Sequence, residues 1–215
     1  LGDVYKRQGE RQLSRIAEIV IERDLLVISD EAYEAIVYDG AKHVSIASLP
    51  ELKERSISIF SCSKTFAMTG WRIGYAAANE EITRQMIKLQ EHLTAHPSSV
   101  SQMAAVAALQ GPKDYIKAWV KEYTERRDLI VGELNEISGV KCLKPQGAFY
   151  VFPNIRAFDM SSSDFAMRIL KRARVILVPG TAFGSNGEGY VRLSYATSKE
   201  NIAEAMRRIK SELRT

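Results

Sequence analysis

Hydrophobic positions along the chain follow two different periods, and together they predict an α/β protein. In residues 9–23 apolar side chains recur every three to four positions, which is the spacing of an amphipathic helix. The next apolar segment, residues 25–29, is short and continuous, as in a strand buried on both faces of a parallel sheet. Further strands are predicted at residues 56–60 and 73–77. Strands that alternate with helices in this way indicate an α/β fold.

The pattern after residue 80 predicts mainly helices, followed by a second group of short strands. One long helix, residues 115–137, could link two domains, and its Arg126 and Arg127 are expected on a solvated face. Serines 98 and 99 are available to cap the helix that they precede. The other expected elements are helices at 81–91, 100–110 and 165–172, a closing helix from Lys199, and strands at 148–152, 175–177 and 190–194.

The first eight residues stand apart from this pattern. They lack the apolar stretch of a secretory signal, and residues 3–8, Asp-Val-Tyr-Lys-Arg-Gln, resemble the translation of a transposase end sequence used to prepare sequencing libraries. We therefore expect residues 1–8 to be a non-native scar and the chain to be the C-terminal fragment of a longer protein. The alternative is a genuine polar N-terminal tail.

Composition and charge exclude several classes of function. The chain has 215 residues, of which 46% are hydrophobic and 26% charged, an ordinary globular composition. Its 30 Lys and Arg against 26 Asp and Glu give a net charge of +4, and the basic residues are scattered, so nucleic acid is not an expected partner. No apolar run approaches the roughly 18 residues that a membrane span needs, so a membrane is not an expected partner either. The two cysteines and three histidines form no metal-ligand pattern, so no metal is expected. The two cysteines also form no disulfide framework, so the reducing cytoplasm is the expected location.

The densest group of reactive side chains follows the predicted strand at residues 56–60. There the sequence SCSKTFAMTGWRIGY places Ser61, Ser63, Lys64 and Arg72 at the position where open α/β sheets bind ligands. Two hydroxyls and an arginine could bind a phosphate while the lysine amine stays available for Schiff-base chemistry. Taken without their context, a lysine and a nearby arginine could equally be solvated surface residues.

This segment resembles the cofactor-lysine segment of the pyridoxal-phosphate aminotransferases of fold type I, the class I/II family that includes aspartate aminotransferase. Three further segments resemble landmarks of that family in the expected order: Ser-Asp-Glu-Ala-Tyr at 29–33, Pro-Gln-Gly-Ala-Phe-Tyr at 145–150, and residues 178–195, which contain Val-Arg-Leu-Ser-Tyr. The resemblance implies that residues 9–114 are the C-terminal part of a large domain with a mostly parallel sheet. Residues 115–215 would be a long linking helix and a small α+β domain.

The resemblance also implies roles for three residues near the reacting atoms. Lys64 would bind pyridoxal 5'-phosphate covalently and then act as the base that moves the substrate's Cα proton. Asp30 would supply the counter-charge to the protonated pyridine nitrogen, and Tyr33 would hydrogen-bond the ring oxygen of the cofactor. Apart from the resemblance, Asp30 could simply cap a turn, and Tyr33 could be a half-buried loop aromatic.

Four more residues would anchor the phosphate and the substrate. Ser61, Ser63 and Arg72 match positions that hold the cofactor phosphate, although either serine could be a plain turn residue. Arg192 matches the arginine that grips the substrate α-carboxylate with its fork of N–H donors. Without the resemblance, an arginine that alternates with Val191 and Leu193 would be an outer-face strand residue.

The implied activity is the transfer of an amino group between an amino acid and a 2-oxo acid, by a full-length protein that is a homodimer. Because complete family members are nearly twice as long, we expect this fragment to be inactive alone. Two alternatives stay open: a pyridoxal-phosphate-dependent carbon–sulfur β-lyase, and the aminotransferase-like sensing domain of a transcription regulator. The amino donor also stays open.

Overall fold

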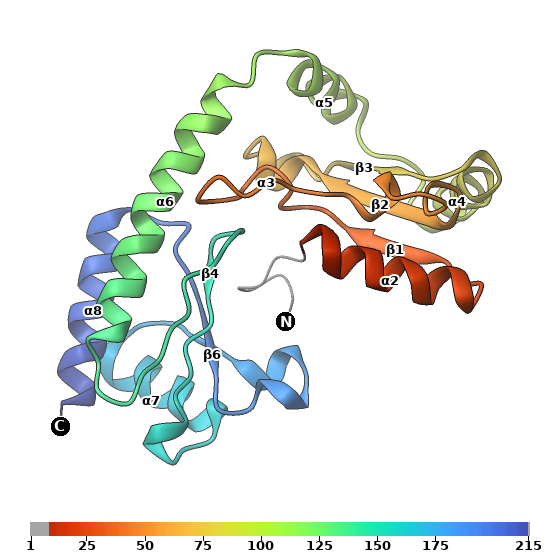
Figure 1. Ribbon diagram of the computed structural model, residues 1–215. Coiled ribbons are helices and arrows are strands. Elements are labelled where there is room, and N and C mark those ends of the chain that lie inside the picture. Colours follow the sequence, from red (N-terminus) through yellow and green to blue (C-terminus); the bar gives the residue numbers. More distant parts are fainter. Residues whose placement is uncertain (1–8, 215) are drawn as a thin grey trace. The chain divides into compact units, whose positions relative to one another are not determined.

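The computed structural model describes residues 9–214, which fall into two compact units, residues 9–117 and 118–214 (Figure 1). The expected scar at residues 1–8 lies outside the described residues. Each unit contains a three-stranded sheet of its own. Within the described part of the chain we find no helix with the length and apolar character required to cross a membrane.

The sheet of the first unit has the order β1-β2-β3. Helix α2 (Glu10–Glu22) leads into β1 (Val27–Asp30), as the hydrophobic pattern predicts. Strand β1 pairs in parallel with β2 (Ser56–Ser61), and β2 pairs in antiparallel fashion with β3 (Gly74–Ala77). Because β1 and β2 run in the same direction, the residues that follow them emerge at one edge of the sheet.

The described residues bury this sheet less completely than the sequence predicts. Residues 25–29 were expected to be covered on both faces, but Ile28 is 71% exposed and strand β3 is exposed along its length. Burial on both faces is therefore wrong for the part of the protein that the structure describes, because burial alternates along β1 and only one face of the strand is covered there. The covered side packs against α2 in a cluster of five buried residues: Leu13, Ala17, Val20, Ile46 and Leu52.

The rest of the first unit is helical. The one-turn helix α3 (Cys62–Thr65) follows β2 directly, and α4 (Glu80–Leu93) and α5 (Ser99–Gln110) follow β3. Ser98 occupies the N-cap position of α5, but its side chain makes no capping hydrogen bond. Helix α5 packs Ala105 against the loop after α3 in a second buried cluster, which also contains Cys62, Met68 and Ile73.

The long helix α6 (Asp114–Asn135) spans the boundary between the units and contains the main correction to the sequence analysis. Arg127 was expected in solvent, yet its side chain is fully buried. Its Nη1 donates a hydrogen bond to the Pro145 carbonyl at 3.1 Å, and its Nε donates to Asp128 at 2.9 Å. These acceptors offset the cost of burying the charge, and they tie the helix to the loop at Pro145.

The second unit has an antiparallel sheet with the order β4-β6-β5, formed by Tyr150–Val151, Val191–Ser194 and Val178–Pro179. The predicted strand at residues 175–177 is wrong, because α7 (Ser162–Ala173) ends at Arg174 in a left-handed conformation and the chain regains the sheet only at Val178. The remaining elements are α8 (Lys199–Leu213) and the short 3-10 helices η1 (Ile46–Ser48), η2 (Lys53–Arg55), η3 (Thr69–Trp71), η4 (Arg156–Phe158), η5 (Gly180–Phe183) and η6 (Ser185–Gly187).

The close packing of β3 against β2 at Gly74 can be tested by substitution. It lies opposite Ser61, and a Cβ at this position would lie 2.4 Å from the Phe60 carbonyl oxygen. We expect Gly74→Ala to lower the free energy of unfolding by about 1–3 kcal/mol, because one of the two strands must shift. Urea unfolding measures this loss. Gly70→Ala is the control, since nothing lies within 4 Å of its added Cβ; equal stabilities of the two variants would contradict the expected clash.

Candidate active site

Lys64 lies on α3, at the edge of the sheet where β1 and β2 end. The side chain of Ser61 caps this single turn, because its hydroxyl oxygen accepts a hydrogen bond from the Ser63 N–H at 3.2 Å. The cap satisfies one of the N–H groups that a helix start leaves without a partner. Lys64 is half-buried and Ser63 is buried. Three predicted site residues thus share one turn of chain.

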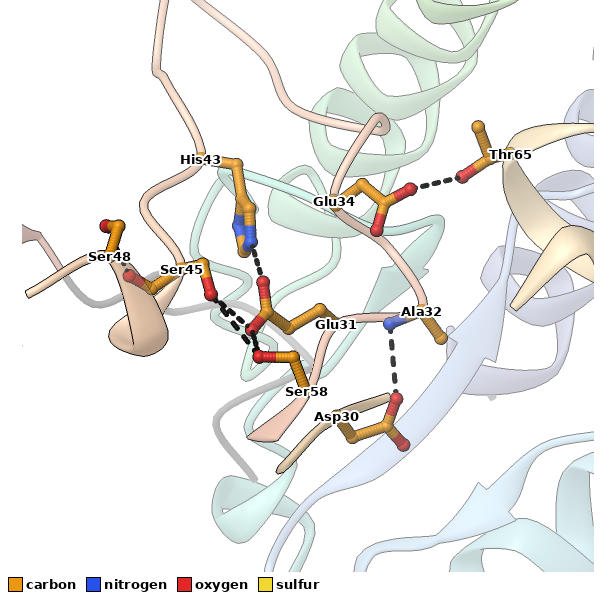
Figure 2. Close-up of polar contacts among 9 residues, drawn as sticks. All are labelled: Asp30, Glu31, Ala32, Glu34, His43, Ser45, Ser48, Ser58 and Thr65. Carbon is orange, nitrogen blue, oxygen red and sulfur yellow. Dashed lines mark hydrogen bonds and ion pairs between the residues drawn. The ribbon is translucent and has the colours of Figure 1, made fainter. Parts of the chain in front are cut away.

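Asp30 and Tyr33 come to the same edge from the neighbouring strand. Asp30 is the last residue of β1 and is exposed, and its Oδ1 accepts a hydrogen bond from the Ala32 N–H at 3.1 Å (Figure 2). This is the turn-capping bond that the sequence allowed as an alternative role. Tyr33 is half-buried in the turn that follows. The parallel strands therefore place the carboxylate and the phenol at the edge from which the lysine turn also starts.

Arg72 lies at the same edge, just before β3 begins. It lies two residues before Gly74, which is paired with Ser61, and its backbone is left-handed with a φ of 51°. Its Nη1 donates a hydrogen bond to the Thr69 carbonyl at 2.9 Å. A guanidinium has five N–H donors, so this contact orients the group without exhausting it. Arg72 is exposed.

A buried carboxylate beside Asp30 is the feature that the sequence analysis missed. Glu31 is 4% exposed, and its Oε1 accepts hydrogen bonds from the hydroxyls of Ser45 at 2.7 Å and Ser58 at 2.9 Å. His43 Nε2 lies 2.6 Å from its Oε2 (Figure 2). Burial alone would raise the pKa of this carboxyl, but the hydrogen bonds from these three residues and the charge of His43 lower the pKa to about 2.

A second acidic residue of the same turn faces the lysine helix. Glu34 Oε1 accepts a 3.4 Å hydrogen bond from the Thr65 hydroxyl, and Thr65 is the neighbour of Lys64 (Figure 2). Its Oε2 is buried and has no hydrogen-bond partner among the described residues. Burial raises the pKa of this carboxyl, which favours its neutral form. Burial of Cys62 itself, together with the charge of Glu34, raises the pKa of the Cys62 thiol. Cys62 is therefore not an activated nucleophile.

Arg192 belongs to the second unit, on strand β6. It is half-buried between the buried residues Val191 and Leu193, in the alternation that the sequence predicts. Its guanidinium carbon lies 4.5 Å from the ring centroid of Tyr150 and 4.6 Å from that of Phe183. Contact with two aromatic rings restricts the orientation of the guanidinium, while its N–H donors point along its own plane. The two rings therefore hold the guanidinium of Arg192 in one orientation.

The predicted site residues thus form two groups, six at one sheet edge of the first unit and Arg192 on the sheet of the second. Among residues 9–214, no group of three or more His, Cys, Asp or Glu side chains could hold a metal ion. The site residues of the first unit offer an amine, a carboxylate, a phenol, two hydroxyls and a guanidinium. This set suits an organic ligand that carries an anionic group.

Curated relatives of the chain carry aminotransferase names. The aspartate aminotransferase of Pyrococcus abyssi is 46% identical over 215 residues, covering 99% of this chain and 54% of the relative. The aromatic-amino-acid aminotransferase 2 of Thermococcus litoralis is 44% identical over 207 residues, covering 95% of this chain and 53% of the relative. The chain therefore spans about half the length of the curated relatives it matches.

Solved structures agree with these sequence matches. The aromatic aminotransferase from Pyrococcus horikoshii OT3 superposes with a TM-score of 0.93 at 47% identity, covering 96% of this chain and 56% of that one. The aspartate aminotransferase from Rhizobium meliloti superposes with a TM-score of 0.92 at 37% identity, covering 96% of this chain and 54% of that one. These matches confirm the fold type I architecture that the motifs implied.

The family itself is identified by a sequence profile described as aminotransferase class I and II, which matches residues 2–209. Enzymes of this family use pyridoxal 5'-phosphate. The match covers the lysine segment, the Asp30 turn and the strand of Arg192, so the resemblance drawn from those motifs is confirmed. The chain belongs to the aminotransferase class I and II family.

Proposed function

We propose that the complete protein transfers an amino group between an amino acid and a 2-oxo acid with the help of pyridoxal 5'-phosphate. The observation that carries the proposal is the common sheet edge of Asp30, at the end of β1, and Lys64, on the turn after the parallel strand β2. The aminotransferase names of the relatives support this reaction over a carbon–sulfur lyase or a sensing domain.

The residues present fit this cofactor. When bound, pyridoxal phosphate withdraws electrons from the substrate Cα, most effectively while its pyridine nitrogen keeps a proton. Asp30 supplies the carboxylate for that proton, and the bond from the Ala32 N–H to its Oδ1 orients the group. Lys64 binds the cofactor through its amine and then holds the Cα proton, and Tyr33 donates to the ring oxygen.

Ser61, Ser63 and Arg72 hold the phosphate in this proposal. A hydroxyl is both a donor and an acceptor, so Ser61 can accept the Ser63 N–H and still donate to a phosphate oxygen. Arg72 adds a positive charge and further donors. Arg192 binds the substrate α-carboxylate, and its two aromatic contacts keep its donor plane fixed.

The wider organisation is part of the same proposal. Residues 9–114 belong to a partial cofactor-binding large domain, and residues 115–215 form the linking helix and the small domain. The complete protein is a cytoplasmic homodimer, with neither nucleic acid nor a membrane as its partner. Relatives named for aspartate and for aromatic amino acids leave both classes of amino donor as candidates.

Lys64→Ala tests the cofactor attachment in the complete protein. We expect this variant to lose transamination and the covalent adduct that borohydride traps, because the amine that forms the bond is gone. Mass spectrometry of the reduced protein detects the adduct. Lys88→Ala, at an exposed position on α4, is the control and keeps the adduct. A trapped lysine adduct in Lys64→Ala would rule out the assignment.

Arg192→Lys tests the substrate carboxylate site. The charge is kept but the fork is lost, so we expect amino-acid binding to weaken by about 1–3 kcal/mol while the spectrum of the bound cofactor stays normal. The Michaelis constant for the amino donor reports the change. Arg172→Lys, on the exposed end of α7, serves as the control. An unchanged Michaelis constant in Arg192→Lys would count against this role.

The 215-residue chain by itself is expected to lack transaminase activity. It spans about half the length of its relatives, and exposed apolar side chains such as Ile28 leave its first sheet incompletely covered. Catalysis requires the cofactor to be held in one orientation, which an incomplete binding site does not achieve. The chain is assayed with pyridoxal phosphate and a panel of amino donors against 2-oxoglutarate. Turnover of about 1 s⁻¹ or more would overturn the expectation.

A further inference from the structure

Glu31 is a buried carboxylate for which the proposed chemistry has no use. Both of its oxygens are occupied, because Oε1 accepts from Ser45 and Ser58 and Oε2 pairs with His43 (Figure 2). A carboxylate with these partners is not aimed at a ligand. It nevertheless directly follows Asp30, the residue assigned to the cofactor's nitrogen. Glu31 can therefore act only through the groups that its carboxylate holds in place.

Glu31 is fixed to β2 through its backbone as well as its side chain. Its N–H donates to the Ile59 carbonyl at 2.8 Å, while its carboxylate binds the neighbouring Ser58. Asp30 is in register with the same Ile59. Strand β2 then runs without interruption into the turn that carries Lys64. Two consecutive residues of β2, Ser58 and Ile59, therefore bind Glu31.

The turn that holds Glu31 also contacts α3, the helix that carries Lys64. Glu34 Oε1 accepts the hydrogen bond from Thr65, and Tyr33 lies between the two contact points in the sequence. His43 and Ser45 add a third connection, because they attach the returning loop to the Glu31 carboxylate. The turn from Asp30 to Glu34 is thus held from β2, from α3 and from its own loop.

We propose that Glu31 is a positioning residue, whose carboxylate, bound by His43, Ser45 and Ser58, fixes the turn that carries Asp30 and Tyr33 against the strand that leads to Lys64. The inference rests on the proposed function. A carboxylate accepts all three bonds at once, whereas a glutamine has a single oxygen and would present an N–H group to His43 Nε2, so that this contact is kept only if His43 changes its tautomer. Glu31 acts on the cofactor through Asp30 and Tyr33 and does not touch it.

The test uses Glu31→Gln in the complete protein, with Glu54→Gln at an exposed position as the matched control. In the cofactor-free protein, hydrogen exchange at the Ala32 amide should accelerate in Glu31→Gln only. In the loaded protein, the dissociation constant of pyridoxal phosphate should rise about tenfold, with an altered absorption spectrum of the lysine-bound cofactor. Glu54→Gln should match the wild type in all three measurements.

A double mutant separates positioning from simple stabilisation. An Asp30→Asn background removes one of the two routes, through Asp30 and through Tyr33, by which Glu31 acts, so Glu31→Gln should change the cofactor dissociation constant less than about threefold there. Full additivity of the two substitutions would overturn the inference. So would a Glu31→Gln protein that melts earlier but keeps the wild-type spectrum and cofactor affinity.

Two further measurements keep the result interpretable. If Glu31→Gln does not fold, Ser45→Ala removes one of the three donors and is judged by the same criteria. The lysine adduct is measured in every variant by borohydride trapping. Loss of the trapped adduct in Lys64→Ala with additive effects at Glu31 overturns the positioning role alone, whereas an adduct that persists in Lys64→Ala overturns the proposed function on which it rests.

Discussion

The parallel pairing of β1 with β2 is the constraint on which the candidate site depends. Two strands that run in the same direction end at the same edge, so Asp30 and Lys64 both lie there although 33 residues separate them in the sequence. An antiparallel pair would put the two residues at opposite ends of the sheet. Strand β3 begins at this same edge, because its first residue, Gly74, pairs with Ser61, and Arg72 lies two residues before it. The parallel pairing thus places five of the six side chains at this edge, and the antiparallel pairing of β2 with β3 adds Arg72.

Keeping Glu31 charged in the interior has an electrostatic consequence. Desolvation opposes the charged form, and the bonds from His43, Ser45 and Ser58 more than offset it, so the pKa falls from 4.5 to about 2. A carboxyl with a lowered pKa in the folded state stabilises the fold fully above its unfolded pKa, and this contribution disappears as the pH falls through the folded pKa. The turn beside Asp30 is thus held most firmly above about pH 4.5 and loosens toward pH 2.

Local sequence patterns predicted much of the fold, and long-range contacts account for what they missed. The helices now seen as α2, α5 and α6 were predicted to within a few residues, because apolar spacing reports on the face that each helix buries. Residues 175–177 have the apolar character of a strand, but the left-handed end of α7 delays the strand until Val178. Composition could not reveal that Arg127 is buried, because its acceptor, the Pro145 carbonyl, lies 18 residues away.

The site residues also divide into those that local motifs predict and those that depend on long-range contacts. Lys64, Asp30 and Arg192 stand in recognisable motifs, whereas Glu31 depends on partners 12, 14 and 27 residues away that no local pattern connects to it. The adjacent acidic residues after a predicted strand were the available signal, and they did not indicate which of the two is buried. The aromatic contacts of Arg192 likewise join β6 to residues from β4 and η5, so only the folded chain reveals them.

The close contact of Gly74 with Phe60 also determines which alignment of β2 and β3 can form. If β3 slipped by one residue in either direction, Ile73 or Tyr75 would take the place of the glycine, and a Cβ there collides with the Phe60 carbonyl oxygen. Such a slip would also turn every side chain of the strand to the opposite face. The absence of a side chain at Gly74 therefore disfavours the slipped alignments of β2 and β3, at the position directly opposite Ser61, whose side chain caps the turn that carries Lys64.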